Sequence, residues 1–287
     1  MTKKSLKNLI EENYDNLTRT QKKIADFLLD SPDITMDMKG KYLSNILEIS
    51  ESSVVRFAQT IGLEGYPDLV LLINDHIKNT RTSIERLNIG YENSYNNASY
   101  YSIEEEIIAL KKVRDHISKK EMSNVVNKLN SAKRIFVLGC RSSHYLASYF
   151  SFYLNFIKSN VYLLGKTEIS IIEELVDVNE GDVIFTFSFP RYTKALTEIL
   201  QFVKDRGAQI ILLTDSENNS NAKYSDITLR VPNNILFFVD SLVVPMAVIN
   251  SLIINLSLLN KQNTINSLTN MEAIWKEYDI FESNKHV

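Results

Sequence analysis

The sequence has a single cysteine, Cys140, and few histidines. One cysteine cannot form an intramolecular disulfide, and it excludes zinc fingers that are built from cysteine pairs. The four histidines are His76, His116, His144 and His286. None of them is paired at the H-x-x-x-H or H-E-x-x-H spacing that presents metal ligands on a helix. We therefore expect no metal site and no bound cofactor.

The chain also lacks an excess of positive charge. Residues 1–80 carry 10 basic and 12 acidic residues, a net charge of −2, and the remaining 22 basic and 23 acidic residues give −1, for a total of −3. A nucleic-acid partner therefore cannot be held by bulk positive charge alone. Such a partner requires local geometry and more than one copy of the binding site.

One long stretch without charge, residues 241–260, has the length of a membrane span. Pro245, Asn250 and Asn255 interrupt it, and neither end shows a bias toward lysine or arginine. A helix buried on all sides, inside a domain or a subunit interface, explains this composition better, so we expect no membrane contact. The N-terminal segment gains acidic residues before any apolar run, so we expect no secretory signal and a cytoplasmic protein.

The length of 287 residues, with 44% hydrophobic and 23% charged residues, favours a globular protein of two domains. Residues 1–78 are predicted to form an all-helical domain. Thr18 and Gln21 make a capping box at the start of one helix. A helix near 39–47, a short turn and a second helix near 51–61 have the proportions of a helix-turn-helix unit.

In a helix-turn-helix unit, the second helix enters the major groove of DNA, and residues near its start contact base edges. The candidate base contacts are Ser52, Ser53 and Arg56, beside Glu51. Arg56 is able to form a forked pair with a guanine edge. The candidate phosphate contacts are Lys39 and Lys41, with Lys22 and Lys23. The alternative is a helical module that binds another protein, which the low positive charge favours.

Residues 79–102 are rich in asparagine, serine and tyrosine and are predicted to form a linker that is partly helical at its start. From residue 103 to 287, short β-rich apolar runs alternate with helical patterns. This alternation predicts an α/β domain with a parallel sheet covered by helices on both faces. The predicted strands are 134–138, 161–164, 182–187, 209–213 and 226–231.

Ligands of open α/β sheets bind at the carboxyl ends of the strands. The segment after the first predicted strand enters a helix and offers hydroxyls and free amides, a pattern typical of anion sites. The segment after the third strand offers hydroxyls and a guanidinium. The candidate ligand residues are Arg141, Ser142, Ser143, Ser188, Arg191 and Thr193. The alternatives are simple helix capping by Ser142 and Ser143 and a solvated loop charge at Arg191.

Residues 17–78 resemble the N-terminal domain of RpiR-type bacterial transcription regulators. The most specific part is the run Ser50-Glu51-Ser52-Ser53-Val54-Val55-Arg56-Phe57, which is followed by Gly62-Leu63-Glu64-Gly65-Tyr66. Residues 105–260 resemble the SIS (sugar isomerase) domain that follows in those regulators. The resemblance implies a dimeric or higher-order regulator of sugar-use genes, which binds a double-stranded DNA operator and senses a phosphosugar-like effector through its SIS domain.

The resemblance also shows where this sequence departs from its family. The SIS pattern G-x-G-x-S falls on Gly139, Arg141 and Ser143, with arginine in place of the second glycine. The pattern S-x-S-G-x-T falls on Ser188, Pro190, Arg191 and Thr193. In the helix-turn-helix turn, Glu48 stands where glycine is usual. These replacements leave open which phosphate or carboxylate fits, and whether phosphate is bound.

A sugar-phosphate isomerase or lyase on the same fold is the alternative function. Proton transfer in such an enzyme requires a positioned base. The candidate bases are His144, Glu168, Glu173 and Glu174. The sequence pairs none of them with a defined acid, and an isomerase has no use for a helix-turn-helix unit. The sequence therefore favours a regulator without enzymatic activity.

Overall fold

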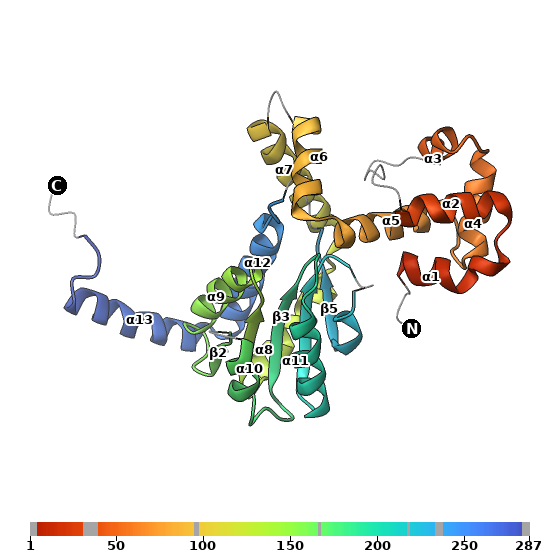
Figure 1. The fold of residues 1–287 in the computed structure, drawn as a ribbon. Helices are drawn as coiled ribbons and strands as arrows, with labels where there is room; N and C mark the ends of the chain where they lie inside the picture. Colours follow the sequence, from red (N-terminus) through yellow and green to blue (C-terminus); the bar gives the residue numbers. More distant parts are fainter. Residues whose placement is uncertain are drawn as a thin grey trace. The chain divides into compact units, whose positions relative to one another are not determined.

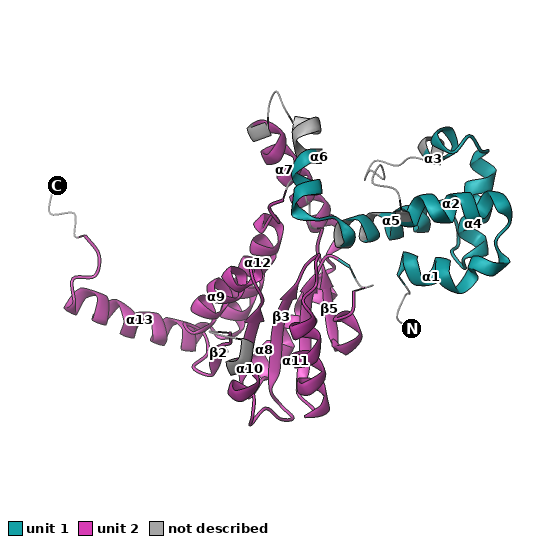
Figure 2. Cartoon of the chain, in the orientation of Figure 1, with its two compact units in different colours: residues 1–91, 216–218 teal, residues 92–215, 219–287 magenta. Residues whose placement is uncertain are grey.

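The computed structural model describes residues 5–30, 40–94, 98–165, 168–216, 219–232 and 238–282. The chain divides into two compact units (Figures 1 and 2). Unit 1 comprises residues 1–91 with 216–218, and unit 2 comprises residues 92–215 with 219–287. Each unit has its own buried apolar core.

Unit 1 is all-helical, as predicted. Its elements are α1 (Leu6–Asn13), the 3-10 turn η1 (Tyr14–Asn16), α2 (Arg19–Asp30), α3 (Gly40–Ile46), α4 (Glu51–Thr60), α5 (Tyr66–Thr80) and α6 (Ser83–Ser94), whose last residues belong to unit 2. The capping box of α2 is confirmed, because Thr18 N donates to Gln21 Oε1 at 3.0 Å and Gln21 N donates to Thr18 Oγ1 at 3.4 Å. Ile24, Leu28 and Phe57 are fully buried in its core.

Helices α3 and α4 occupy the two ranges predicted for the helix-turn-helix unit. Ser50 caps α4, its side chain accepting a hydrogen bond from Ser53 N at 3.2 Å. Gly62 follows α4 with a φ of 90°, a left-handed conformation that glycine adopts without strain. The helix therefore ends where the sequence predicts.

The segment 79–102, predicted as a linker, is more helical than its weak periodicity indicates, since it contains α6 and the start of α7 (Ala98–His116). Thr82 N donates to Glu85 Oε2 at 2.6 Å, and Glu85 N donates to Thr82 Oγ1 at 3.2 Å. This reciprocal pair is a capping box at the start of α6. This capping box of Thr82 and Glu85 marks the start of α6 in the sequence, but it was not among the predicted features.

Unit 2 contains a five-stranded parallel sheet, which confirms the predicted α/β class. Its strands are β1 (Ile135–Gly139), β2 (Val161–Leu163), β3 (Val183–Ser188), β4 (Gln209–Thr214) and β5 (Ile227–Arg230). Their order in the sheet is β2-β1-β3-β4-β5, and all four pairings are parallel. Strands β1, β3 and β4 are almost entirely buried, as expected for a sheet covered on both faces.

Helices cover the two faces of the sheet (Figure 1). The remaining elements of unit 2 are α8 (Lys119–Ser131), α9 (Ser143–Leu154), α10 (Glu168–Glu174), α11 (Lys194–Asp205), the 3-10 turn η2 (Ala222–Tyr224), α12 (Val243–Leu259) and α13 (Lys261–Glu277). One core cluster joins α7, α8, α9 and α12 to alternate strand residues such as Val137 and Phe185. The other joins α10 and α11 to the intervening residues, such as Phe136 and Ile184.

Helix α12 carries the uncharged stretch of the sequence. It buries Val248, Leu252 and Leu256, but Ile254 and Leu258 are 57% and 68% exposed. The prediction of a helix buried on all sides is therefore wrong for the single chain, because α12 packs against α7, α8 and α9 through one face only. Within the described residues, no single helix meets the length and apolarity of a bilayer span, and α12 with α13 does so only as a pair bent by 103°.

Candidate functional site

The strand order places a topological switch point between β1 and β3. From β1 the chain crosses to β2 on one side, and it later returns to β3 on the other side. Open α/β sheets bind ligands in the crevice outside the carboxyl ends of the strands at such a point. Gly139 is the register partner of Phe187, so the segments that leave β1 and β3 start side by side. These segments contain all six predicted ligand residues.

Gly139 makes the tight exit from β1 possible. A Cβ at this position would overlap the carbonyl oxygen of Ser143, so no other residue fits here. The chain folds back within four residues, Ser143 N donating to Cys140 O at 3.1 Å and His144 N to Arg141 O at 3.0 Å. Ser143 is buried at the first residue of α9, where the positive end of the helix dipole favours an anion.

Ser188 is buried at the carboxyl end of β3. Its Oγ accepts a hydrogen bond from Asn221 Nδ2 at 2.8 Å, and Thr197 Oγ1 donates to Asn221 Oδ1 at 2.7 Å. Since Ser188 acts as the acceptor in this bond, its own proton is available for an oxygen atom of a ligand. The network fixes the hydroxyl in position before any ligand arrives.

Asn221 and Thr197 were not predicted as site residues. The loop after β4 also holds Asn219, whose Nδ2 donates to Thr214 Oγ1 at 3.0 Å. Both asparagines are buried. In the sequence they lie in an Asn- and Ser-rich segment that turn formation explains equally well. Their burial, which the sequence does not show, distinguishes them from ordinary turn residues.

Ser142 and Thr193 do not act as simple helix caps. They occupy the N-cap positions of α9 and α11, yet neither side chain makes a capping hydrogen bond. The alternative that Ser142 simply caps α9 is therefore wrong. Tyr192 OH donates to Asp215 Oδ1 at 3.0 Å, which ties the segment after β3 to the end of β4.

Three of the four non-glycine residues with positive φ in the described chain stand where the resembled family has glycine. They are Glu48 (φ 53°), Arg141 (φ 55°) and Arg191 (φ 67°). A side chain in this left-handed region costs about 1–2 kcal/mol. The chain thus keeps the backbone path of a glycine-containing loop and adds a charged side chain. Arg141 and Arg191 are both exposed on the loops that leave β1 and β3.

The candidate bases of an isomerase are not gathered into a buried site. Glu173 and Glu174 are exposed on α10, and His144 is half-buried near the start of α9. The side chain of Glu168 lies outside the described residues. The exposed glutamates therefore lack the burial in which a carboxylate becomes a stronger base.

In unit 1, the first turn of α4 presents a linked set of polar groups. Ser50 Oγ lies 2.8 Å from both Ser52 Oγ and Ser53 Oγ. The exposed Arg56 donates from Nε to Ser52 O and from Nη2 to Ser52 Oγ, each at 3.2 Å. Ser52 therefore orients the guanidinium of Arg56, and the two residues form one hydrogen-bonded group on the surface of α4.

The predicted phosphate contacts have different surroundings. Lys39 lies outside the described residues, and Lys41 lies on α3 with its side chain outside them. Lys23 Nζ donates to Leu47 O at 2.7 Å, so this lysine binds the turn between α3 and α4. Lys22 Nζ lies 5.0 Å from the centre of the Tyr14 ring.

Helix α2 holds the helix-turn-helix unit at two points. One is the bond from Lys23 to the turn, and the other is the bond from Gln21 Nε2 to Thr60 Oγ1 at 2.7 Å, at the end of α4. We call these two bonds the α2 clamp. Because they bracket α4, they fix its direction relative to α2.

Comparison with known families agrees with this geometry. Residues 4–80 match the family model of the rpiR family helix-turn-helix domain, and residues 128–255 match the SIS domain model. The chain belongs to the RpiR family of helix-turn-helix transcriptional regulators. The two matched models follow each other in the order that the motifs predict.

RpiR-type relatives cover most of the chain. The transcriptional regulator HexR of Escherichia coli is 26% identical over 78% of each chain, and the regulator YfhH of the same species is 29% identical over 74% of this chain and 76% of its own. Among solved structures, the Vibrio vulnificus NanR protein complexed with ManNAc-6P has a TM-score of 0.60 at 16% identity, covering 97% of this chain and 100% of that one. The sugar isomerase domain of an RpiR transcription factor from Sphaerobacter thermophilus has a TM-score of 0.57 at 19% identity, covering 60% of this chain and 96% of that one.

Proposed function

We propose that this RpiR-family protein regulates sugar-metabolism genes by binding operator DNA through residues 1–78 and a phosphosugar-like effector through residues 103–287. The observation that carries the proposal is the placement of two buried hydroxyls at the switch point of the sheet, that of Ser143 on the segment that leaves β1 and that of Ser188 at the end of the neighbouring strand β3. The similarity to NanR, which is complexed with ManNAc-6P, supports a sugar phosphate as the effector.

The effector is expected to be an anion. Hydroxyls of Ser143, Ser188 and Thr193 and the amides at the starts of α9 and α11 suit phosphate oxygens. Arg141 and Arg191 add two guanidiniums on the same two loops. Guanidinium forks bind phosphate or carboxylate in a bidentate manner, so these arginines extend recognition to a second anionic group of the effector.

On the DNA side, Ser52, Ser53 and Arg56 are proposed to contact base edges, and Lys39 and Lys41 to contact phosphates. With a net charge of −2 over residues 1–80, one unit supplies little electrostatic affinity. We therefore propose a homodimer or tetramer whose paired recognition helices read half-sites about 34–36 Å apart. The protein is proposed to act in the cytoplasm, without catalysis, in line with relatives that are named as regulators.

Binding to DNA fragments selected by the wild-type protein from a random-sequence library tests this proposal. The affinity should fall linearly with the logarithm of salt concentration, with a slope of about −0.9 per phosphate contacted. The Arg56→Ala variant should lose specific binding while it stays folded, because the base-contacting fork is gone.

Arg114→Ala is the matched control, since Arg114 is an exposed arginine of unit 2. It should bind DNA like the wild type. Wild-type binding that does not respond to salt would favour the alternative of a protein-binding module. Equal affinity of Arg56→Ala and wild type would show that α4 is not the recognition helix.

A further inference from the structure

Helix α4 presents four exposed side chains in one stripe along its surface. They stand at positions i, i+3, i+4 and i+7 of the helix: Ser52, Val55, Arg56 and Gln59. With 3.6 residues per turn, these four side chains fall within about 100° of the helix circumference, and the buried residues of α4 lie on the opposite side. We call these four residues the reading face.

Two members of the reading face, Val55 and Gln59, have no role within unit 1. Within the described chain, the side-chain amide of Gln59 makes no hydrogen bond. The side chain of Val55 is 38% exposed. A single exposed valine is ordinary on a protein surface. The position of Val55 between Ser52 and Gln59, beside Arg56, is what makes it available to the same partner as these residues.

The turn of α4 that carries Gln59 is held in place by its neighbour Thr60. Thr60 Oγ1 accepts the hydrogen bond from Gln21 Nε2 at 2.7 Å and donates to Arg56 O at 2.8 Å. The polar group of Thr60 is thus used inside unit 1, whereas the amide of Gln59 is not. A fixed turn presents this amide with little loss of backbone freedom on binding.

The reading face has the dimensions of a short run of base pairs. Its seven-residue span corresponds to about 10 Å along the helix axis at 1.5 Å per residue. Base pairs are about 3.4 Å apart, so this length matches about three of them. Residues at i, i+3, i+4 and i+7 are the set that a recognition helix presents to base edges in the major groove.

The amide of Gln59 matches the edge of an adenine. A glutamine amide offers one acceptor and one donor side by side. In the major groove, adenine presents the N7 acceptor and the N6 donor, whereas guanine presents two acceptors. Glutamine therefore forms a bidentate pair with adenine and not with guanine. Such a pair discriminates against the wrong base by roughly 5–150-fold.

The side chain of Val55 matches a methyl group. It is branched and stiff and carries no polar atom, so it makes no hydrogen bond with any base edge. Thymine is the one base that presents an apolar group, its C5-methyl, in the major groove. Burial of one such group strengthens binding about 2–4-fold.

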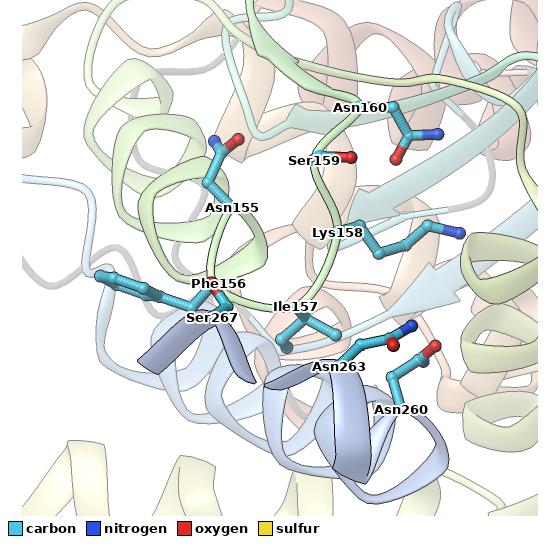
Figure 3. Close-up of a pocket in the computed structure, with 9 residues that line it drawn as sticks. All are labelled: Asn155, Phe156, Ile157, Lys158, Ser159, Asn160, Asn260, Asn263 and Ser267. Carbon is cyan, nitrogen blue, oxygen red and sulfur yellow. The ribbon is translucent and has the colours of Figure 1, made fainter. Parts of the chain in front are cut away.

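The hollow in unit 2 is not a second site for nucleic acid. It has a volume of about 450 Å³ and is lined by residues 155–160 and by Asn260, Asn263 and Ser267 (Figure 3). Lys158 is the only charged residue among these nine, all of which lie in the described chain. Its Nζ donates to the carbonyl oxygens of Leu129, Asn130 and Ala132 at 3.3, 2.6 and 3.5 Å, which uses all three donors of an ammonium group.

We propose that Gln59 and Val55 determine operator specificity together with Arg56. Gln59 selects an adenine, and Val55 selects the methyl group of a thymine. Both bases lie within about three base pairs of the guanine that Arg56 contacts. This inference rests on the proposed function, because it takes α4 as the recognition helix. It adds that each half-site combines a G·C pair with A·T pairs that are read in the major groove.

Base analogues in the operator selected by the wild type test the role of Gln59. Replacement of the contacted adenine by 7-deazaadenine removes the N7 acceptor and should weaken wild-type binding about 2–10-fold. Gln59→Ala should bind both DNAs equally and should select a sequence without preference at this position. Because Gln59 is exposed and alanine favours helices, the fold should stay intact. Gln262→Ala, at an exposed glutamine of unit 2, is the matched control.

Replacement of thymine by uracil tests the role of Val55, because it removes only the methyl group. At one position of the half-site it should weaken wild-type binding about 2–4-fold. Val55→Ala should bind the two DNAs equally. Val176→Ala, at a valine of unit 2 that is 64% exposed, is the matched control and should respond to uracil like the wild type.

The assignment of Gln59 is overturned if Gln59→Ala selects the wild-type sequence and responds to 7-deazaadenine like the wild type. It is also overturned if Gln59→Ala weakens binding to all sequences equally, since Gln59 would then contact a phosphate. An undiminished response of Val55→Ala to uracil overturns the assignment of Val55. In each of these outcomes Arg56→Ala still loses specific binding, so the proposed function stands. A wild type that selects no DNA sequence overturns both.

Discussion

Arg141 and Arg191 combine a loop conformation that suits glycine with a side chain that suits anions. The tight exit after Gly139 and the register of β1 with β3 set the path of both loops. Along this path Arg141 and Arg191 have a positive φ, which is strained for a residue with a side chain. Strain of about 1–2 kcal/mol persists where the surrounding structure determines the conformation, and such positions cluster at ligand sites. The strain is thus consistent with a ligand-binding role of the guanidiniums.

Replacement of either arginine by glycine should stabilise the fold. We expect Arg141→Gly and Arg191→Gly each to raise the free energy of unfolding by about 0.5–1 kcal/mol, because the relieved strain exceeds the added entropy of the unfolded chain. Ser142→Gly, in the same loop at a φ of −58°, should lower it by about 0.5 kcal/mol. Urea denaturation measures all three, and destabilisation by both arginine replacements would contradict the strain argument.

Ser52 and Arg56 should act as a unit in DNA recognition. The Ser52→Ala change removes the Oγ acceptor of the bond from Nη2, whereas the bond from Nε to the Ser52 carbonyl oxygen remains, so the guanidinium is held at one point and not at two. We expect this change to weaken specific DNA binding about tenfold or less. In an Arg56→Ala background the same change should weaken binding less than it does in the wild type, because only the contact of Ser52 itself with a base edge is then lost. A double-mutant cycle with additive losses would show that Ser52 contacts DNA independently of Arg56.

At the residue scale, the sequence predicts contacts between residues that are a few positions apart in the chain. The capping box at Thr18 is present as predicted. The sequence does not predict Asn221, because the hydrogen bond to Ser188 joins residues 33 positions apart. Nor does it predict that Lys23 binds the Leu47 carbonyl, since a lysine on a helix surface has the same local signature whether it meets a phosphate or a carbonyl.

At the scale of elements, the α2 clamp makes the position of α4 depend on α2. Lys23→Gln should lower the free energy of unfolding by about 1 kcal/mol, because the charge-assisted bond to the turn is lost. The salt slope of DNA binding should stay the same. Lys120→Gln, which removes an equal charge from the exposed surface of unit 2, is the control. A fall of the slope by about 1 in Lys23→Gln would identify Lys23 as a phosphate contact instead.

Helix α5 contains a histidine that should make the stability of unit 1 depend on pH. Burial, with a smaller contribution from Lys7, lowers the pKa of His76 below its usual 6.5. The unfolded chain then binds the proton more tightly than the folded chain, so the free energy of unfolding falls as the pH drops below 6.5.

His76→Gln should remove this part of the pH dependence. Thermal unfolding of wild type and variant, each at pH values above and below 6.5, gives the difference that belongs to His76. An equal loss of stability in both proteins on acidification would mean that other groups are responsible. The comparison cancels the titration of histidines elsewhere in the chain, since both proteins share them.

The strands were the easiest elements to predict, because buried parallel strands are short continuous apolar runs. All five lie within one or two residues of the predicted ranges. Helix α12 shows the limit of this reasoning. An uncharged sequence predicts burial on all sides, but the single chain buries only one face of it.

For the whole molecule, the proposed regulation requires that effector binding and DNA binding change each other's affinity. The effector must bind one arrangement of the assembly more tightly than another, or it shifts nothing. Coupling of about 1–3 kcal/mol, or roughly 5–150-fold in affinity, is typical. Family membership follows from motifs that the sequence displays, but the identity of the effector does not, because Arg141 and Arg191 change the groups that meet it.

The most direct test of this coupling is the affinity for selected operator DNA in the presence of a panel of sugar phosphates, measured by fluorescence anisotropy. At least one sugar phosphate should change the wild-type dissociation constant about 5-fold or more, whereas its unphosphorylated sugar should not. Arg191→Ala and Ser188→Ala should bind the DNA like the wild type and lose this response. If the wild type bound DNA equally with every compound, or if both variants responded like the wild type, the segments that leave β1 and β3 would not form the effector site.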